Sequence, residues 1–392
     1  MKKSFRKFLN RILSLGVLAT LALGATSCES SIYDDGYDCD PKYYLRFVFD
    51  MNMEYANAFT KQVNSVEVWV FDKETQQLVD HITESGDALK DDAFMVPLNI
   101  NPGDYHIVTW AGLKDNRHFK VMDGVTHLPH PKVRMERKMD EMNRPNANEL
   151  LDELFHSIID INAPDEKEMQ SIVNGASKMK AQEAPYGTES VYDPVCFWDE
   201  NEKIFKVIYT ASLIRDTNNI VLSLEHLSGE FNLDQIGIEM TDNNGTMLHD
   251  NNIDNDDEVI TYTPWRMANG SLEQGVLTKA GFDINDPENS NGHYADFITS
   301  EISTARMTTD HDKVIRIYYK DTDQTVFSIP VNKWIEALRS AKYRDMGMQE
   351  FLDRENDFEL MVFLQDDGRG GWTAVSVVIN GWHIIDNGEE NL

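Results

Sequence analysis

Short runs of β-branched and aromatic residues recur along the chain after residue 43, and residues that favour turns separate them. In the first half these runs lie at 44–49, 63–71, 77–82, 94–100 and 105–110. Runs of this length and composition are typical of β-strands. The last two are joined by a turn in which Pro102 presets φ and Gly103 accepts a positive φ. Short strands joined by such turns favour a β-sandwich.

A second series of the same kind fills the other half of the chain. Its runs lie at 205–211, 219–227, 235–240, 258–263, 297–307, 314–319, 325–329, 358–364 and 373–379. Asn243-Asn244-Gly245 predicts a hairpin turn, and residues 331–343 and 348–354 have the pattern of a helical crossover. We therefore predict a mainly β chain with two tandem β-sandwich domains, at 43–204 and 205–392.

The segment at about 127–187 lacks strand periodicity. Within it, apolar residues recur at helical spacing after Asn148, a candidate N-cap; they are Leu150, Leu151, Leu154, Phe155, Ile158 and Ile159. We predict a helical insertion in the first sandwich. An amphipathic helix packed on a sheet accounts for this stripe better than a cofactor-binding surface does.

The N-terminus carries basic residues and then an uncharged apolar stretch at 12–27, shorter than the roughly 20 residues that a membrane span needs. This pattern is typical of a secretory signal. Its exit, Ala25-Thr26-Ser27-Cys28, resembles the lipobox of bacterial lipoproteins. We predict a signal peptide at 1–27 and a lipidated Cys28, which would hold the protein on the membrane; the alternative is an ordinary signal peptide with Cys28 incidental.

An acidic tether at 28–42 follows, with Asp34, Asp35, Asp38 and Asp40. Acids in this place resemble the surface-export signals of some outer-membrane lipoproteins. The formal net charge of the whole chain is −31, and removal of the basic signal peptide makes it more negative. Such a charge argues against a nucleic-acid partner, whose phosphates require basic patches. It also opposes binding to an anionic membrane, so the lipid must hold the protein there.

Cysteine is scarce, with only Cys28, Cys39 and Cys196. If Cys28 is lipidated, Cys39 and Cys196 remain in an oxidising compartment where a disulfide persists. A bridge between them would close a loop of about 157 residues, which the chain-entropy model values at about 4 to 5 kcal/mol. Two unpaired thiols are the alternative.

The sequence lacks the short motifs of nucleotide binding, of serine hydrolases and of zinc peptidases. His127 and His130 could contribute to a metal site, but a solvated loop is the better account because no third ligand is near. The acids between Asp250 and Glu258 could hold Ca²⁺, yet their spacing fits no EF-hand and favours a polar loop. Trp69, Trp110 and Trp382 are expected to anchor packing. We predict no enzyme activity, no metal and no cofactor.

Several short motifs, in order, resemble the fimbrillin-associated anchor proteins, the lipoprotein base subunits of type V fimbriae. They are RFVFDMNM at 46–53, YANAF at 55–59, VEVWVFD at 66–72, PGDY at 102–105, TWAGL at 109–113, LIRDTNNI at 213–220, FLDREN at 351–356 and INGW at 379–382. In the segment 127–187, only Leu154-Phe155 aligns. The resemblance implies two transthyretin-like sandwiches that anchor a fimbrium to the outer membrane and limit its length, with the fimbrial stalk subunits as partners.

Fimbriae can grow when one subunit lends a strand to the open sheet of another. The C-terminal residues 387–392 are polar and acidic and lack the alternating apolar residues of a donated strand. We therefore expect the body to offer an edge or surface to the first stalk subunit. A ligand- or glycan-binding surface lipoprotein is the alternative function.

Overall fold

The computed structural model describes residues 41–122, 124–179, 192–226, 234–273, 294–369 and 371–385. The signal peptide, Cys28, Cys39 and the C-terminal tail lie outside these ranges. Within them, no helix has both the length and the apolar character needed to cross a bilayer.

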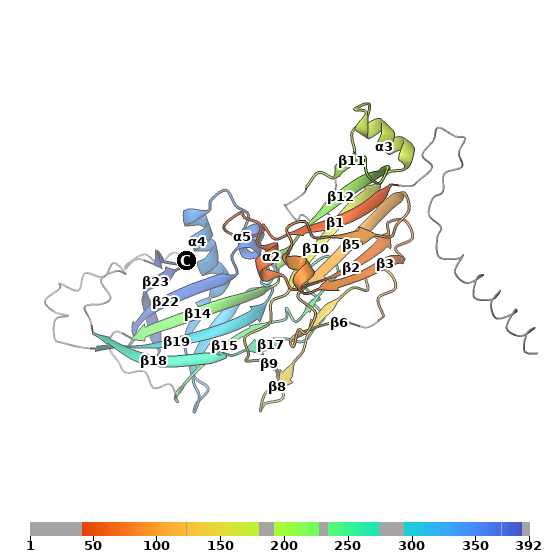
Figure 1. Cartoon of the computed structure of the whole chain (residues 1–392). Helices are drawn as coiled ribbons and strands as arrows, with labels where there is room; N and C mark the ends of the chain where they lie inside the picture. Colours follow the sequence, from red (N-terminus) through yellow and green to blue (C-terminus); the bar gives the residue numbers. More distant parts are fainter. Residues whose placement is uncertain are drawn as a thin grey trace, which may run out of the picture.

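The first sandwich is built from two sheets that enclose one apolar core (Figure 1). One sheet has the order β11 (Val195–Asp199), β12 (Ile204–Ser212), β1 (Lys42–Val48), β4 (Met95–Leu98). The other has the order β13 (Ile214–Arg215), β10 (Phe155–Ala163), β5 (Gly103–Ala111), β2 (Ser65–Asp72), β3 (Leu78–Ser85). In β1, Tyr43, Leu45 and Phe47 are buried while the residues between them are not, which is the alternation of a strand with one face on a core.

The second sandwich has two larger sheets. The first has the order β18 (Arg266–Glu273), β19 (Tyr294–Ala305), β14 (Thr217–His226), β22 (Asp357–Asp366), β23 (Trp372–Ile379), β24 (Trp382–Ile385). The second has the order β21 (Thr325–Pro330), β20 (Val314–Tyr319), β15 (Ile236–Asp242), β17 (Ile260–Tyr262), β9 (Pro145–Ala147), β8 (Lys138–Met139). Helices α4 (Val331–Lys342) and α5 (Met348–Arg354) connect β21 to β22, which confirms the predicted crossover.

A segment of the first half of the chain becomes part of the second sandwich. Strands β8 and β9 extend one of its sheets, and β9 pairs in parallel with β17. Strands β6 (Phe119–Val121) and β7 (Val133–Met135) form a small sheet with β16 (Thr246–Met247). Trp69 and Trp110, on the outer face of the first sandwich, belong to the core cluster of the second. The core of the second sandwich therefore extends over the outer face of the first sandwich, and this shared core is separate from the inner core of the first sandwich.

The helix predicted over residues 150–159 is wrong, because β10 occupies this place. Strand β10 lies between β5 and β13, with Ile158 packed in the second core and Phe155 and Ile159 in the first. A strand buried on both faces is apolar at almost every position, so its residues also match a helical spacing. The segment does contain one helix, α3 (Glu166–Val173), which the Asp165 side chain caps at the N-terminus.

The structure also moves the boundary between the sandwiches, which the sequence places at 204/205. Strand β12 pairs in parallel with β1 over its whole length and so belongs to the first sandwich. The chain passes to the second sandwich at Asp216, between β13 and β14. Periodicity identifies a strand but not its partner, and β1 lies more than 150 residues upstream.

Candidate functional site

Three of the motif segments that are distant in sequence meet where the two sandwiches join. Arg354, at the end of α5, donates from Nη1 to the carbonyl oxygen of Asp50, 3.1 Å away. The Leu213 N–H donates to the Val48 carbonyl at 2.9 Å, and the Asn219 N–H donates to the Asn356 carbonyl at 2.8 Å. These segments therefore form the junction itself.

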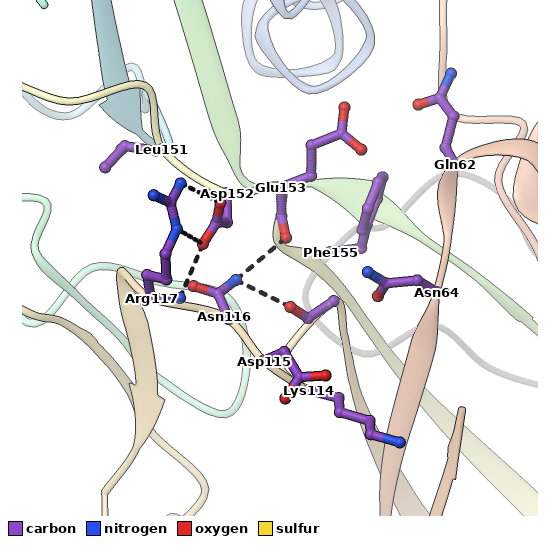
Figure 2. Close-up of a pocket in the computed structure, with 11 residues that line it drawn as sticks. Gln62, Asn64, Lys114, Asp115, Asn116, Arg117, Leu151, Asp152, Glu153 and Phe155 are labelled. Atoms are coloured by element: carbon purple, nitrogen blue, oxygen red, sulfur yellow. Dashed lines mark hydrogen bonds and ion pairs between the residues drawn. The ribbon is translucent and has the colours of Figure 1, made fainter. Parts of the chain in front are cut away.

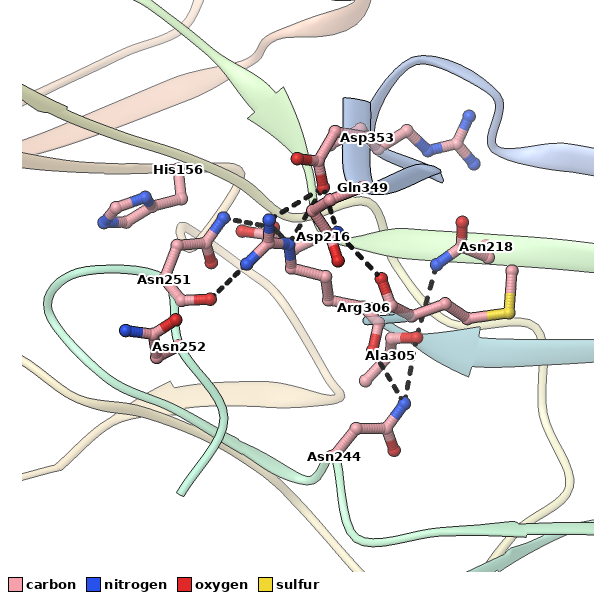
Figure 3. A network of polar contacts seen from close by, with 12 residues as sticks. His156, Asp216, Asn218, Asn244, Asn251, Asn252, Ala305, Arg306, Gln349 and Asp353 are labelled. Carbon is pink, nitrogen blue, oxygen red and sulfur yellow. Dashed lines mark hydrogen bonds and ion pairs between the residues drawn. The ribbon is translucent and has the colours of Figure 1, made fainter. Parts of the chain in front are cut away.

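Arg306, which follows β19, is buried at the centre of this junction (Figure 3). Its Nη2 donates to Oδ1 of Asp353 at 2.7 Å, and its Nη1 donates to the Asn251 carbonyl. Its Nε lies 3.6 Å from Oδ1 of Asp216, which accepts a hydrogen bond from Nδ2 of Asn251 at 2.9 Å. Gln349 completes the shell by donating to Oδ1 of Asp353 at 2.9 Å.

Burial dominates the electrostatics of this network. Removal of water raises the pKa of Asp216 to about 7, against the opposing effects of Arg306 and Asn251. For Arg306, burial lowers the pKa, but Asp353 and Asp216 outweigh it and the net shift is upward. His156 is fully buried against Trp110, and burial lowers its pKa to about 3. His156 is therefore neutral at physiological pH, and its Nε2 donates to the His249 carbonyl at 2.9 Å.

Two polar clefts border the junction. One, of about 400 Å³, lies beside the Arg306 network and is lined by Met51, Asp250, Asp310 and Glu350 among others. The other, of about 360 Å³, lies between the end of β5 and residues 151–155 (Figure 2). In the second cleft Arg117 Nη2 donates to Oδ1 of Asp152 at 2.9 Å. Arg117 and Asp152 are thus paired with each other, and both clefts are lined mainly by polar groups.

The candidate metal residues from the sequence lie in loops. The rings of His127 and His130 contact each other, with centroids 3.7 Å apart and planes tilted by 50°. Of the acidic loop, Asp254 pairs with Lys132 at 3.0 Å, and Asp257 pairs with Arg134 and Arg137. In the described ranges, no group of three or more His, Cys, Asp or Glu side chains is placed to hold a metal ion.

The other candidate residues have mixed outcomes. Trp69 and Trp110 are buried in the shared core, which confirms them as packing anchors; the side chain of Trp382 lies outside the described part. Cys196 is half-buried with its Sγ 2.8 Å from Sδ of Met179. Because Cys39 is not described, the Cys39–Cys196 disulfide stays a prediction, as does lipidation at Cys28.

Sequence reasoning missed Arg306 and Asp216. The available signal was a single arginine within the predicted apolar strand 297–307, since a charge inside such a run needs a buried partner. The identity of that partner required the structure.

A family model of the fimbrillin-A associated anchor proteins Mfa1 and Mfa2 matches residues 36–174 and 200–388, which include most of both sandwiches. The chain belongs to this family. The predicted resemblance is thereby confirmed, and membership indicates a fimbrium-associated, cell-surface protein whose partners are other protein subunits. The relatives are structural fimbrial and adhesin proteins rather than enzymes.

Solved structures share the fold. A candidate adhesin from Bacteroides thetaiotaomicron is 24% identical, with 90% of this chain and 100% of that chain covered and a TM-score of 0.64. A candidate polysaccharide-binding protein from the same species is 23% identical with the same coverage and TM-score. The fimbrial anchor protein Mfa2 from Porphyromonas gingivalis is 15% identical, with 89% and 100% covered and a TM-score of 0.57. No protein with a curated description matches the chain.

Proposed function

We propose that this protein is a lipid-tethered anchor subunit that attaches a fimbrium to the outer membrane through Cys28 and limits fimbrial length. The observation that carries the proposal is the match to the anchor family across both sandwiches. The lipobox-like sequence before Cys28 and the acidic tether after it supply the membrane end that an anchor requires. The hydrogen bond from Arg354 to the Asp50 carbonyl and the buried pairing of Arg306 with Asp216 on the connecting segment hold the sandwiches together, which suits a subunit that transmits force.

Lipidation is tested by metabolic labelling with a palmitate analogue in the source bacterium. We expect Cys28→Ala to lose the label and to leave the membrane fraction, because the acyl chains proposed at Cys28 are what hold the protein in the bilayer. Ser27→Ala, which keeps a small residue before the cysteine, serves as the matched control and should label normally. Full labelling of Cys28→Ala would place the lipid elsewhere.

Anchoring and length control are tested by deleting the gene and restoring it with either the natural protein or Cys28→Ala. Electron microscopy measures fimbrial length, and immunoblotting of the medium measures shed fimbriae. We expect the deletion strain and the Cys28→Ala strain to shed fimbriae, and the deletion strain to make longer ones. Attached fimbriae of normal length in the deletion strain would exclude the anchor function.

Capture of the purified stalk subunit tests whether this protein accepts a strand from its partner or donates its own C-terminal strand. Removal of residues 387–392 should leave its capture nearly unchanged, because this tail has little apolar surface to bury. Proline placed in an accepting edge strand should weaken capture by removing a backbone donor. Loss of capture on truncation alone would show that the tail is the donated strand.

Glycan binding is the competing function. Sugar-binding sites on β-sandwiches need exposed aromatic platforms; Trp69, Trp110 and Trp334 are buried, whereas Tyr55 and Phe197 are 61% and 37% exposed. A glycan array with the purified protein separates the two functions, since an anchor should show no saturable binding.

A further inference from the structure

The outer face of the first sheet, formed by β11, β12, β1 and β4, is partly exposed to solvent in the described part of the chain, whereas Thr210 and Ser212 at one end of it are buried. Its centre is a row of apolar side chains that crosses all four strands in register: Val195, Ile208, Tyr44 and Pro97. Phe197 and Met95 lie in the rows on either side, and Val195, Phe197 and Met95 are 43%, 37% and 38% exposed. The opposite face of the same strands fills the first core.

Cations flank this apolar row. Lys42 and Lys206 share the row of Phe197, and Arg46 shares the row of Met95. Asp199 and Glu202 balance the two lysines through ion pairs of 2.7–2.8 Å, while Arg46 Nε donates to the neutral Thr210 hydroxyl at 2.7 Å. These three rows hold three cations, and the acids that pair with them, Asp199 and Glu202, lie beside the rows on a chain whose net charge is −31.

The tether brings this face close to the membrane. Strand β1 begins at Lys42, and residues 29–41 separate it from Cys28. Such a linker reaches at most about 45 Å when extended and about 20 Å as a flexible coil. A lipid on Cys28 therefore keeps the face within reach of the headgroups, whereas the bulk of the protein is acidic and is repelled by them.

We propose that the outer face of the first sheet lies on the membrane, with Lys42 and Arg46 beside phosphate-bearing lipid headgroups and Phe197 and Val195 at their level. Aromatic and aliphatic side chains bordered by cations are the composition of interfacial membrane contacts. This orientation deepens the proposed function, because it fixes which end of the anchor faces the fimbrium. It rests on the lipid tether at Cys28 in the cell.

The test uses tethering that does not depend on natural lipidation. The full mature chain receives an N-terminal histidine tag in place of Cys28 and is bound to vesicles that contain a nickel-chelating lipid and phosphatidylglycerol. With Cys39→Ser and Cys196→Ser, a fluorophore is attached through Phe197→Cys or, as the matched control, Met361→Cys. Met361 is also 37% exposed, but it lies on β22 in the second sandwich (Figure 1). Lipids with a nitroxide on the headgroup quench nearby fluorophores.

We expect several-fold stronger quenching at position 197 than at position 361. Arg46→Glu should reduce the quenching at position 197, whereas Arg266→Glu, on β18, should not.

Equal quenching at the two positions would overturn the proposal. So would shielding of position 197 that grows with protein concentration without vesicles, because the face would then bind a second copy. If the cysteine variants fold poorly, hydrogen exchange of the tagged wild-type chain on vesicles decides, with protection expected in β11 and not in β22. A failure of Cys28 labelling in cells would leave these results unaffected and would count against the tether alone.

Discussion

At the scale of single residues, the junction depends on one guanidinium. Arg306 exposes only 8% of its surface and bonds to groups from three separate segments, represented by Asp353, Asp216 and Asn251. A buried charge is costly unless it is paired, and removing one partner leaves the other uncompensated. The arginine therefore matters less for net stability than for the single geometry in which its partners are all satisfied.

We expect Arg306→Leu to destabilise the protein by about 3–5 kcal/mol, because Asp353 would be left buried without a counter-charge and Asp216 would have to take up a proton. Arg266→Leu is the matched control. Arg266 pairs with Glu301 at 3.0 Å but is 66% exposed, so its loss should cost about 0–1 kcal/mol. Urea unfolding measures the loss of stability in both variants. Equal losses would show that the buried network around Arg306 contributes no more than the exposed Arg266–Glu301 pair.

Glu225 predicts a pH dependence. It lies on the central strand β14 between Phe297 and Phe363, its Oε1 has no hydrogen-bond partner, and burial raises its pKa from 4.5 to about 7. The folded state then holds a proton that the unfolded state has lost, so stability falls as the pH rises from about 4.5 to about 7. Asp216, whose pKa is also raised to about 7, adds to the same trend.

Glu225→Gln should therefore raise stability at pH 8 by about 3 kcal/mol and leave it nearly unchanged at pH 4. Glu359→Gln, at an exposed position of β22, is the control and should have little effect at either pH. Urea unfolding at the two pH values is the measurement. An equal gain at both would contradict titration as the cause.

At the scale of elements, the turn after β5 is fixed by a close approach to the start of β10. Gly112 has φ +84°, and a Cβ at this position would lie 2.4 Å from the carbonyl oxygen of Glu153. Its N–H donates to the Ser65 carbonyl at 2.9 Å. Glycine is therefore required twice here, for its backbone conformation and for its lack of a side chain.

Gly112→Ala should lower the free energy of unfolding distinctly more than Gly124→Ala does. Gly124 has nearly the same φ, +87°, but open space around its Cα, so it shows the conformational cost alone, about 1–2 kcal/mol. The additional cost of Gly112→Ala then measures the clash with Glu153. Thermal unfolding of the two variants is the test, and similar costs would mean that β10 shifts to accommodate the methyl group.

At the scale of the whole molecule, the two sandwiches are interlocked. Strands β8 and β9 come from the first half of the chain and extend a sheet of the second sandwich. Phe119, on β6, is fully buried in the core cluster that includes Trp110 of the first sandwich and Ile260 of the second. Neither sandwich can lose its packing without exposing part of the other.

Calorimetry should therefore give one unfolding transition whose van't Hoff and calorimetric enthalpies agree. Phe119→Ala should lower the free energy of unfolding by about 3–5 kcal/mol. It should keep a single transition and increase hydrogen exchange in both sandwiches. Two separate transitions in the natural protein would show that the shared core does not couple them.

The sequence by itself determined many of the strands, the tandem order of two sandwiches and the crossover helices, because period-2 burial and turn residues are local properties. It also determined the family, since short motifs such as FLDREN at 351–356 keep their order along the chain. The tertiary structure alone decided that β10 is a strand, that β12 pairs with β1, and that 119–147 joins the second sandwich. The physical reason is that burial on both faces removes periodicity, and strand partners far apart in sequence leave no local trace. Arg306 shows the same division: its charge is visible in the chain, but only the fold places Asp353 and Asp216 beside it.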